Sequence, residues 1–197
     1  MANGRVLTGF SLPVVAKYTA EGTTITYSDG QALARGVDVT LDIESSDASH
    51  FWADNVAAES VGGQFTGGTV TLTVDGLKDA ARRLILGITA EGTIGEAKSI
   101  DYDDTMVIPY VGLGFICRYM EQGVTTYVPV ILPKIAFDVD GLETATQEED
   151  IEFQTQELTA TILRDDSATH MWRRVVEAQE TEADALAIIN TALGISA

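Results

Sequence analysis

The sequence offers few side chains for acid–base chemistry. Its two histidines are His50, which precedes Phe51 and Trp52, and His170, which lies close to Trp172. Two isolated histidines are little material for a histidine-centred hydrolase or a histidine metal site. We therefore predict aromatic packing or a surface position for both rings.

Nucleophilic and phosphate-binding motifs are also missing from the sequence. Cys117, the only cysteine, lies inside the apolar run Val111–Met120, so we expect a buried thiol without a lowered pKa. The Gly-Leu-Gly at 112–114 lacks the lysine and the following helix of a phosphate loop. The sequence contains no paired-carboxylate, GxSxG or cysteine-metal signature. It thus predicts a protein that is not an enzyme and uses no cofactor.

Two acidic stretches contain oxygen ligands of the kind that hard cations prefer, but neither completes a known loop. Asp101, Asp103 and Asp104 lie close together without a glycine turn or a distal bidentate glutamate. The stretch DVDGLETATQEE has acids at the first, third and twelfth positions of a calcium loop, but its glycine is at position four instead of six. We therefore predict no metal site.

Acidity is the strongest feature of the composition. The 197 residues include 30 Asp and Glu against 12 Lys and Arg, a net charge of −18. Such a surface repels nucleic acid, although acidity can also simply keep a protein soluble. The N-terminus lacks a signal-peptide pattern, and no apolar segment approaches the roughly 20 residues of a membrane span. We expect one soluble domain in the cytosol, long enough to bury a hydrophobic core.

The other elements are expected to be arranged around the stretch Arg35–Gly87. Two segments in it alternate apolar with polar residues, which predicts strands with one buried and one wet face. Their apolar residues are Val37, Val39, Leu41 and Ile43, then Val70, Leu72 and Val74. The period then becomes helical, with an apolar face formed by Leu77, Ala80, Ala81, Leu84 and Ile85. We expect this helix at about 75–86, between an Asp75 N-cap and a Gly87 stop.

A long arm, residues 45–68, joins these two strands and far exceeds an ordinary strand connection. Its apolar residues are too many for a solvated linker and too sparse for a core of their own. They are Phe51, Trp52, Val56, Val61 and Phe65. We therefore predict that the arm finds its apolar partner on another chain.

Further strands are expected on both sides of this unit. Residues 1–34 predict two strands joined near Glu21 and Gly22, and residues 106–120 predict a strand buried on both faces. The latter turns at 120–123 into another strand, which Pro133 interrupts. Residues 149–163 predict two strand segments, offset by a bulge or tight turn at 156–157.

The end of the chain is predicted to be helical. Helical spacing of apolar residues from Trp172 to Gln179 predicts one helix. The variant capping box Thr181-Glu182-Ala183-Asp184 predicts the start of a second helix, which Gly194 ends.

The order of these motifs resembles that of a known family. Arg35–Gly87 contains a strand, an arm with FWADN, the strand GGTVTLTVDGL and a short helix. The second half contains VGLGFICRYMEQGVTTYVPVILPKIAFDVD, followed by EEDIEFQTQELTATILRDD. In this order the motifs are similar to those of the major tail proteins, which build the tail tube of bacteriophages with long non-contractile tails.

The resemblance implies a mainly β fold, a β-sandwich or rolled sheet with one flanking helix, a long inter-strand arm and helical C-terminal residues. It implies a tail-tube β domain at 1–165 and a C-terminal helical extension at 166–197. Such subunits form hexameric rings that stack into a tube for DNA, and their partners are tape measure, tail terminator and baseplate proteins. They are assembled in the host cytoplasm and reside in the virion tail.

The polar faces of the predicted strands are candidates for the wall of such a tube. They carry no Lys or Arg, which suits a channel that DNA must pass without being held. The candidate residues are Asp38, Thr40, Asp42, Thr69, Thr71, Thr73, Glu152, Gln154, Thr159 and Thr161. An alternating pattern does not distinguish inside from outside, so an outward, solvent-facing position is the competing interpretation.

Two other functions fit the same sequence. The tube subunit of a contractile tail or of a phage-tail-like bacteriocin would have the same fold and a similar sequence. A monomeric β-sandwich binding or adhesion domain would also fit the composition, but it would leave the arm at 45–68 without a purpose.

Overall fold

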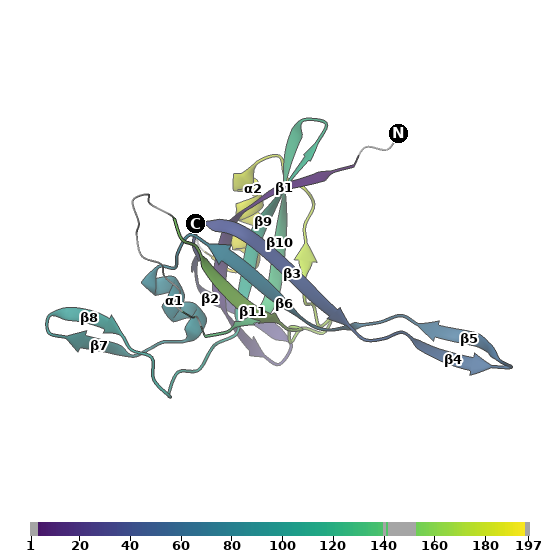
Figure 1. Ribbon diagram of the computed structural model, residues 1–197, viewed down its shortest axis with the longest axis horizontal. Helices are drawn as coiled ribbons and strands as arrows, with labels where there is room; N and C mark the ends of the chain where they lie inside the picture. Colours follow the sequence, from purple (N-terminus) through teal and green to yellow (C-terminus); the bar gives the residue numbers. More distant parts are fainter. Residues whose placement is uncertain (1–3, 140, 142–152, 196–197) are drawn as a thin grey trace.

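The computed structural model describes residues 4–139, 141 and 153–195, and within them the protein is mainly β (Figure 1). The principal element is an antiparallel sheet of eight strands. The elements are β1 (Val6–Glu21), β2 (Thr24–Ala32), β3 (Gly36–Ser45), β4 (Ser49–Ala53), β5 (Val56–Val61), β6 (Phe65–Val74), α1 (Asp79–Leu86), β7 (Glu91–Ile94), β8 (Ala97–Ile100), β9 (Val111–Glu121), β10 (Val124–Phe137), β11 (Gln156–Ile162), β12 (Arg174–Val175) and α2 (Glu182–Ala192).

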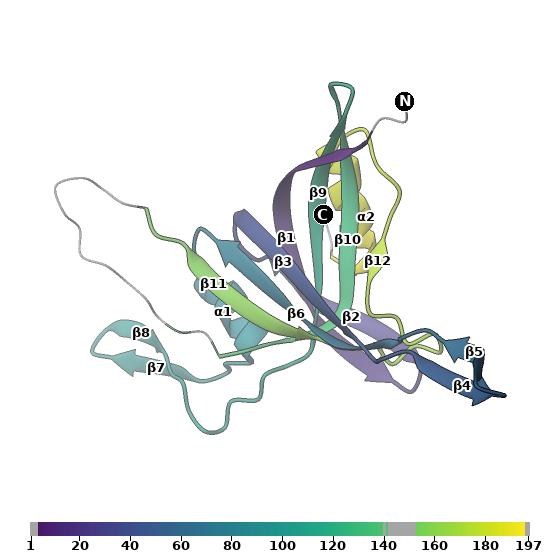
Figure 2. The ribbon, with the colours of Figure 1, turned by 45° about the vertical axis from the view of Figure 1, so that its right-hand side comes forward.

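The sheet follows the order β2-β1-β9-β10-β11-β6-β3, and β12 pairs with β10 outside this path. The long strand β10 joins the two halves of the sheet, β2-β1-β9 and β11-β6-β3. It pairs with β9 over most of its length and with β11 at its end. Its register shifts between Leu132 and Ile135, so Pro133 lies at a bulge and does not end the strand as predicted. The β11-β6-β3 half therefore crosses in front of upright β9 and β10 (Figure 2).

Because the two halves of the sheet cross, the sheet forms a roll, and the main hydrophobic core lies inside it. Leu72 of β6 and Leu158 of β11 point inward against the layer that contains Phe115 and Leu132. Ile85 and its neighbours on α1 belong to the same cluster, so α1 contributes to this core and does not lie on the outer side of the sheet. The spacing of alternate buried residues along β6 confirms the predicted strand with one buried face.

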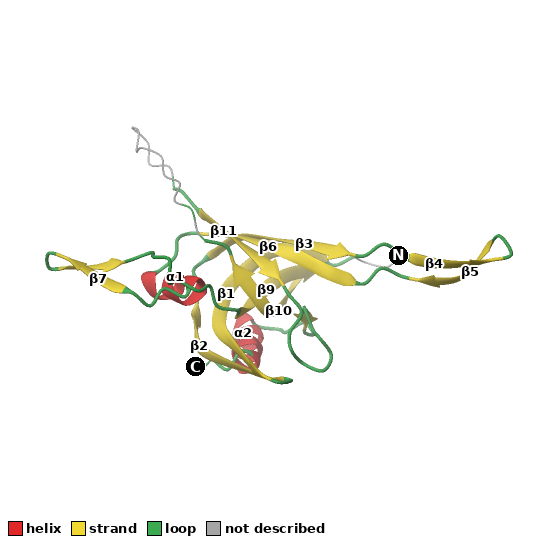
Figure 3. Cartoon of the chain, turned by 90° about the horizontal axis from the view of Figure 1, so that it is seen from below, coloured by secondary structure: helices red, strands yellow, loops and turns green. Residues whose placement is uncertain are grey.

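A second, smaller cluster lies on the opposite face of β9 and β10. There Ala185, Ile189 and Leu193 of the C-terminal segment pack on Ile116 and Ile131. The layers therefore run from α2, through β1-β9-β10 and the core, to β11-β6-β3 (Figure 3). The outer face of that last layer is exposed or half-buried in the described chain.

Several predicted strands are confirmed. β1 and β2 form the expected N-terminal hairpin around Gly22, which has a φ of 62°. β9 is buried without interruption from Val111 to Ile116, as predicted for a strand covered on both faces. Gln122 and Gly123, both with positive φ, turn it into β10.

The predicted start of α1 is wrong by about one turn. The N-cap is Lys78, without a side-chain cap, and the helix begins at Asp79. Asp75 instead accepts a hydrogen bond of 2.9 Å from the backbone N–H of Arg35, so its carboxylate serves the pairing of β3 with β6. The Gly87 stop is confirmed, with a left-handed φ of 66°.

The helix predicted from Trp172 to Gln179 is wrong, because this segment pairs with β10. The backbone N–H groups of Tyr127 and Gln179 donate to each other's carbonyls at 2.9 and 2.7 Å, and β12 continues the pairing. The edge of β10 thus overrides a local helical spacing. The second helix is confirmed as α2: the Thr181 hydroxyl accepts a hydrogen bond of 3.1 Å from the Asp184 backbone.

The segment beyond residue 165 packs on the sheet through β12 and α2. The division into domains at 165 remains a prediction. Neither described helix is long and apolar enough to cross a membrane.

Candidate interaction surfaces

The predicted polar strand faces lie side by side on the outer face of β11-β6-β3. Antiparallel pairing aligns their side chains in three rows, because directly opposed residues share one face. The rows are Asp38–Thr73–Glu157, Thr40–Thr71–Thr159 and Asp42–Thr69–Thr161. The opposite side chains of the same strands belong to the core. We call these nine residues, together with Glu44 opposite Gly67, the polar face.

Two predicted members do not belong to the polar face, and two others were missed. Glu152 lies outside the described residues, and Gln154 lies before β11, so it is not in the strand. Glu157 takes the place opposite Thr73, because β11 pairs with β6 in unbroken register and lacks the predicted bulge. Glu44 continues the alternation of β3 and lies opposite Gly67; one further step of the same period would have identified it.

The polar face is uniformly free of cations. The sequences of β3, β6 and β11 contain no Lys or Arg, and their outer side chains include the carboxylates of Asp38, Asp42, Glu44 and Glu157. These four side chains are exposed, whereas the threonines of central β6 are half-buried between their neighbours. The surface is therefore hydroxyl-rich and negative, a poor surface for binding phosphates.

The predicted arm is a β-hairpin that projects from the body beyond β3 and β6 (Figure 1). β4 and β5 pair with each other and form their own two-stranded sheet. Asp54 and Asn55, both with positive φ, make the turn. The sequence indicated the arm through its composition but not its hairpin form, because no strict alternation runs through 49–61.

The hairpin exposes apolar side chains on both of its faces. The pairs Phe51–Glu59, Ala53–Val56 and Ser49–Val61 place Phe51, Val56 and Val61 on one face, around Glu59. Trp52 lies on the other face beside His50, with ring centroids 6.4 Å apart. Phe51 and Trp52 keep 65% and 64% of their surface exposed. Exposed aromatic groups of this kind mark an interaction surface.

Phe65 is the exception among the predicted arm residues. It is the first residue of β6 and pairs with Ser45 at the end of β3. Its half-buried ring stacks on Trp172 at 4.4 Å, with the Arg164 guanidinium 5.8 Å away. Phe65 thus finds its aromatic partner within its own chain.

The remaining titratable candidates make local contacts. His170 Nδ1 lies 3.2 Å from the carbonyl oxygen of Asp165, and Asp103 accepts hydrogen bonds from the Thr105 backbone and hydroxyl at 2.8 and 2.6 Å. Cys117 is half-buried on β9, less than predicted, and burial raises the pKa of its thiol. Within the described residues no cluster of His, Cys, Asp and Glu has the arrangement of a metal site.

No protein-family model matches this sequence, and no curated protein matches it either. Two surfaces of the described chain, the polar face and the β4–β5 hairpin, therefore bear on its function.

Proposed function

We propose that this protein is the subunit of a bacteriophage tail tube, which polymerises as stacked rings into a conduit for DNA. The observation that carries the proposal is the β4–β5 hairpin, with its exposed Phe51, Trp52, Val56 and Val61. A two-stranded hairpin alone is marginally stable in water, and its apolar groups favour a further binding partner. A second copy of the same chain supplies such a partner at every step of a polymer.

The chemistry of the polar face also supports a tube through which DNA passes. A tube for DNA needs a wall that does not hold phosphates, and each Lys or Arg on that wall would add a salt-dependent contact. The three rows of threonine and carboxylate side chains meet this requirement. Placed inward in every ring, they form a negative, hydroxyl-lined channel.

The β3 edge supports assembly through the sheet itself. Among the described residues, β3 is the last strand in the order and pairs with β6 alone. No described strand pairs with its outer edge, and pairing between subunits there would join the individual sheets into one barrel.

Electron microscopy of the purified, concentrated protein tests the proposal. Rings or tubes in negative stain, together with sedimentation of the polymer, are the expected result. A protein that stays monomeric at millimolar concentration would refute it and favour the monomeric binding domain. Tubes of the contractile or bacteriocin class would look alike, so their distinction requires the neighbouring tail proteins.

A further inference from the structure

A groove beside α2 lies outside the two regions described above. It consists of two depressions of about 540 and 410 Å³, and Arg174, Thr191 and Ala192 line both. The larger continues toward Ile25 and Met171, and the smaller is lined by the apolar side chains of α2. Cavities of this volume accept aromatic side chains.

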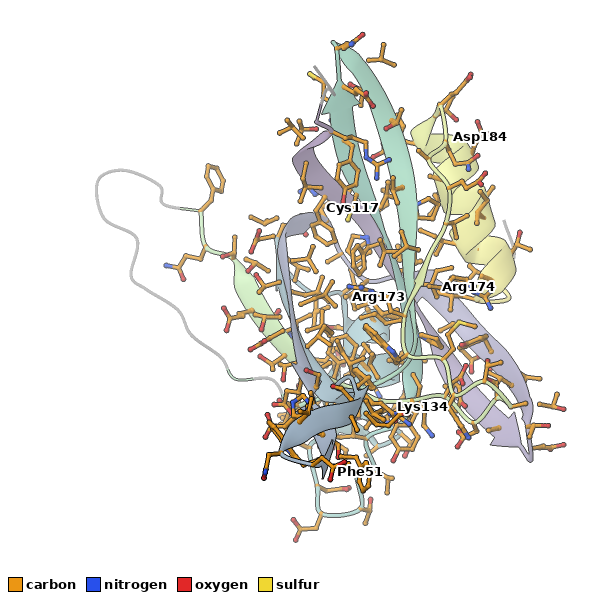
Figure 4. The ribbon with its side chains drawn as sticks, turned by 90° about the vertical axis from the view of Figure 1, so that its right-hand side faces the viewer. Phe51, Cys117, Lys134, Arg173, Arg174 and Asp184 are labelled. Carbon is orange, nitrogen blue, oxygen red and sulfur yellow. The ribbon has the colours of Figure 1, made fainter. Side chains whose placement is uncertain are left out.

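Arg174 lines both depressions. It is exposed, and no carboxylate of the described residues lies within ion-pair distance of its guanidinium. Arg173 beside it lies over the Trp172 ring at 4.8 Å. Figure 4 labels both arginines. The buried Asp165 carboxylate also lines the larger depression; it accepts hydrogen bonds from Ser167 and Met171 and forms no ion pair with Arg174.

Charge and polarity make the β4–β5 hairpin the fitting occupant of this groove. Residues 45–68 contain Asp47, Asp54 and Glu59 and neither Lys nor Arg. Glu59 projects from the face that also carries Phe51, Val56 and Val61. A carboxylate surrounded by exposed apolar groups thus complements the Arg174 guanidinium beside the apolar depression on α2.

The opposite end of the molecule fits less well. Ile94 of the β7–β8 hairpin and Val107 are exposed there, at 77% and 76%. However, the same end carries Asp101, Asp103 and Asp104, which have the same sign as the arm. Like charges brought together across an interface cost several kcal/mol, which excludes this end as the preferred acceptor.

We infer that the groove around Arg174 receives the β4–β5 hairpin of a second copy, with Glu59 paired to Arg174 and the Phe51 ring in an adjoining depression. This inference rests on the proposed function and specifies its contact. Donor and acceptor are different surfaces, so the contact is heterologous and propagates into a ring or a filament.

A charge swap tests the pairing. Arg174→Glu and Glu59→Arg should each raise the protein concentration needed for assembly by at least about tenfold, because each places like charges face to face. The double variant should return to within about threefold of wild type. Lys98→Glu, which reverses an exposed charge on β8, is the control and should leave assembly unchanged. Assembly of Arg174→Glu at the wild-type concentration, or no recovery in a folded double variant, would overturn the inference.

A cross-link tests the contact separately from tube formation. Subunits with Cys117→Ala and Ala53→Cys, which retain Phe51, are mixed with subunits carrying Cys117→Ala and Ala187→Cys and then oxidised. A mixed disulfide dimer is expected, and replacing Ala187→Cys by Ala97→Cys on exposed β8 should abolish it. Rings without this cross-link would overturn the docking and leave the tube proposal standing. The cross-link without rings would do the reverse.

Discussion

Among single residues, Asp166 connects three separate parts of the chain. Its Oδ2 accepts hydrogen bonds from Lys134 Nζ of β10 and from the Tyr18 hydroxyl of β1, each at 2.7 Å. The Asp166 backbone N–H donates to the same hydroxyl at 2.9 Å. The hydrogen bond from Lys134, followed by that from Tyr18, lowers the pKa of the Asp166 carboxyl. Burial, followed by the hydrogen bond to Asp166, raises the pKa of Tyr18 to about 12.

The Asp166 contacts predict a defined acid sensitivity. Because the folded-state pKa is lowered, the ionised carboxylate stabilises the fold above its unfolded pKa of about 4, and this contribution disappears as the pH falls through the folded value. Asp166→Asn should therefore be less stable than wild type at pH 7, and the difference should shrink below pH 4. Urea unfolding at several pH values measures it, with Asp104→Asn as an exposed control. A difference independent of pH would contradict the assignment.

Cys117 predicts slow thiol chemistry in the folded protein. Burial raises the pKa of its thiol, and β1 and β10 flank it on the sheet. Alkylation at pH 8 should therefore be at least about tenfold slower than in denaturant, since the thiolate is the reactive species. The rate of iodoacetamide labelling, followed by mass spectrometry, measures this ratio. Equal rates would mean that β9 opens readily at this position.

Among the elements, the β4–β5 hairpin differs from the others because its apolar side chains contribute nothing to the core. Phe51→Ala combined with Trp52→Ala should change the free energy of unfolding by less than about 1 kcal/mol, since both rings are exposed. The same double variant should lose assembly, because aromatic anchors dominate interfaces. Thermal unfolding and sedimentation give the two readouts, and Ile94→Ala at the other hairpin is the control. Assembly at an unchanged concentration would end the arm hypothesis.

Helix α1 has the opposite role and supports the subunit itself. Ile85 is fully buried in the main core, whereas Leu84 is half-buried. Ile85→Ala should therefore cost about 2–5 kcal/mol of unfolding free energy, and Leu84→Ala clearly less. Chemical denaturation of both variants gives the comparison. Equal losses, or a loss below about 1 kcal/mol for Ile85→Ala, would mean that the packing face of α1 is wrongly assigned.

Local patterns could predict the elements with strong periodicity and not those determined by pairing. The alternation in β6 and in β3 from Asp38 to Glu44, the buried run of β9 and the Thr181 cap of α2 are properties of neighbouring residues, and all are confirmed. Val37, predicted on the buried face of β3, is 55% exposed, because the pairing with β6 shifts register between Gly36 and Asp38. The segment before α2 has helical spacing in the sequence, but in the structure it pairs as a strand with the edge of β10. The groove around Arg174 combines residues of β2, β12 and α2, so sequence spacing alone contains no signal for it.

In the whole molecule, different parts of the fold have three different roles. The inner faces of the roll and α1 hold the subunit together, and α2 covers one outer side. The β4–β5 hairpin and the Arg174 groove are the two halves of the proposed contact. The outer side of β11-β6-β3 is the polar face, which lines the channel in the proposed tube.

The polar face therefore predicts how DNA behaves in the assembled tube. Thr40→Lys combined with Thr71→Lys introduces cations into the middle row, which is flanked by rows containing Asp38 and Asp42. Each subunit would then offer two contacts to phosphates, and repetition along the tube should convert a surface that releases DNA into one that retains it. Wild-type tubes should not sediment with short DNA duplexes, whereas variant tubes should, with binding that weakens steeply as salt rises.

Thr93→Lys with Ala97→Lys adds the same charge on the exposed β7–β8 hairpin, away from the polar face, and should bind DNA far less within the tube. A structure of the assembled tube supplies the direct answer, because the three rows then line the channel in every ring. A channel lined by Lys or Arg, with Asp38, Asp42 and Glu157 on the outer surface, would refute a wall selected to release DNA. In that case the carboxylates of the polar face would serve only to keep the tube soluble, and the middle-row lysines would bind DNA no better than those on β7–β8.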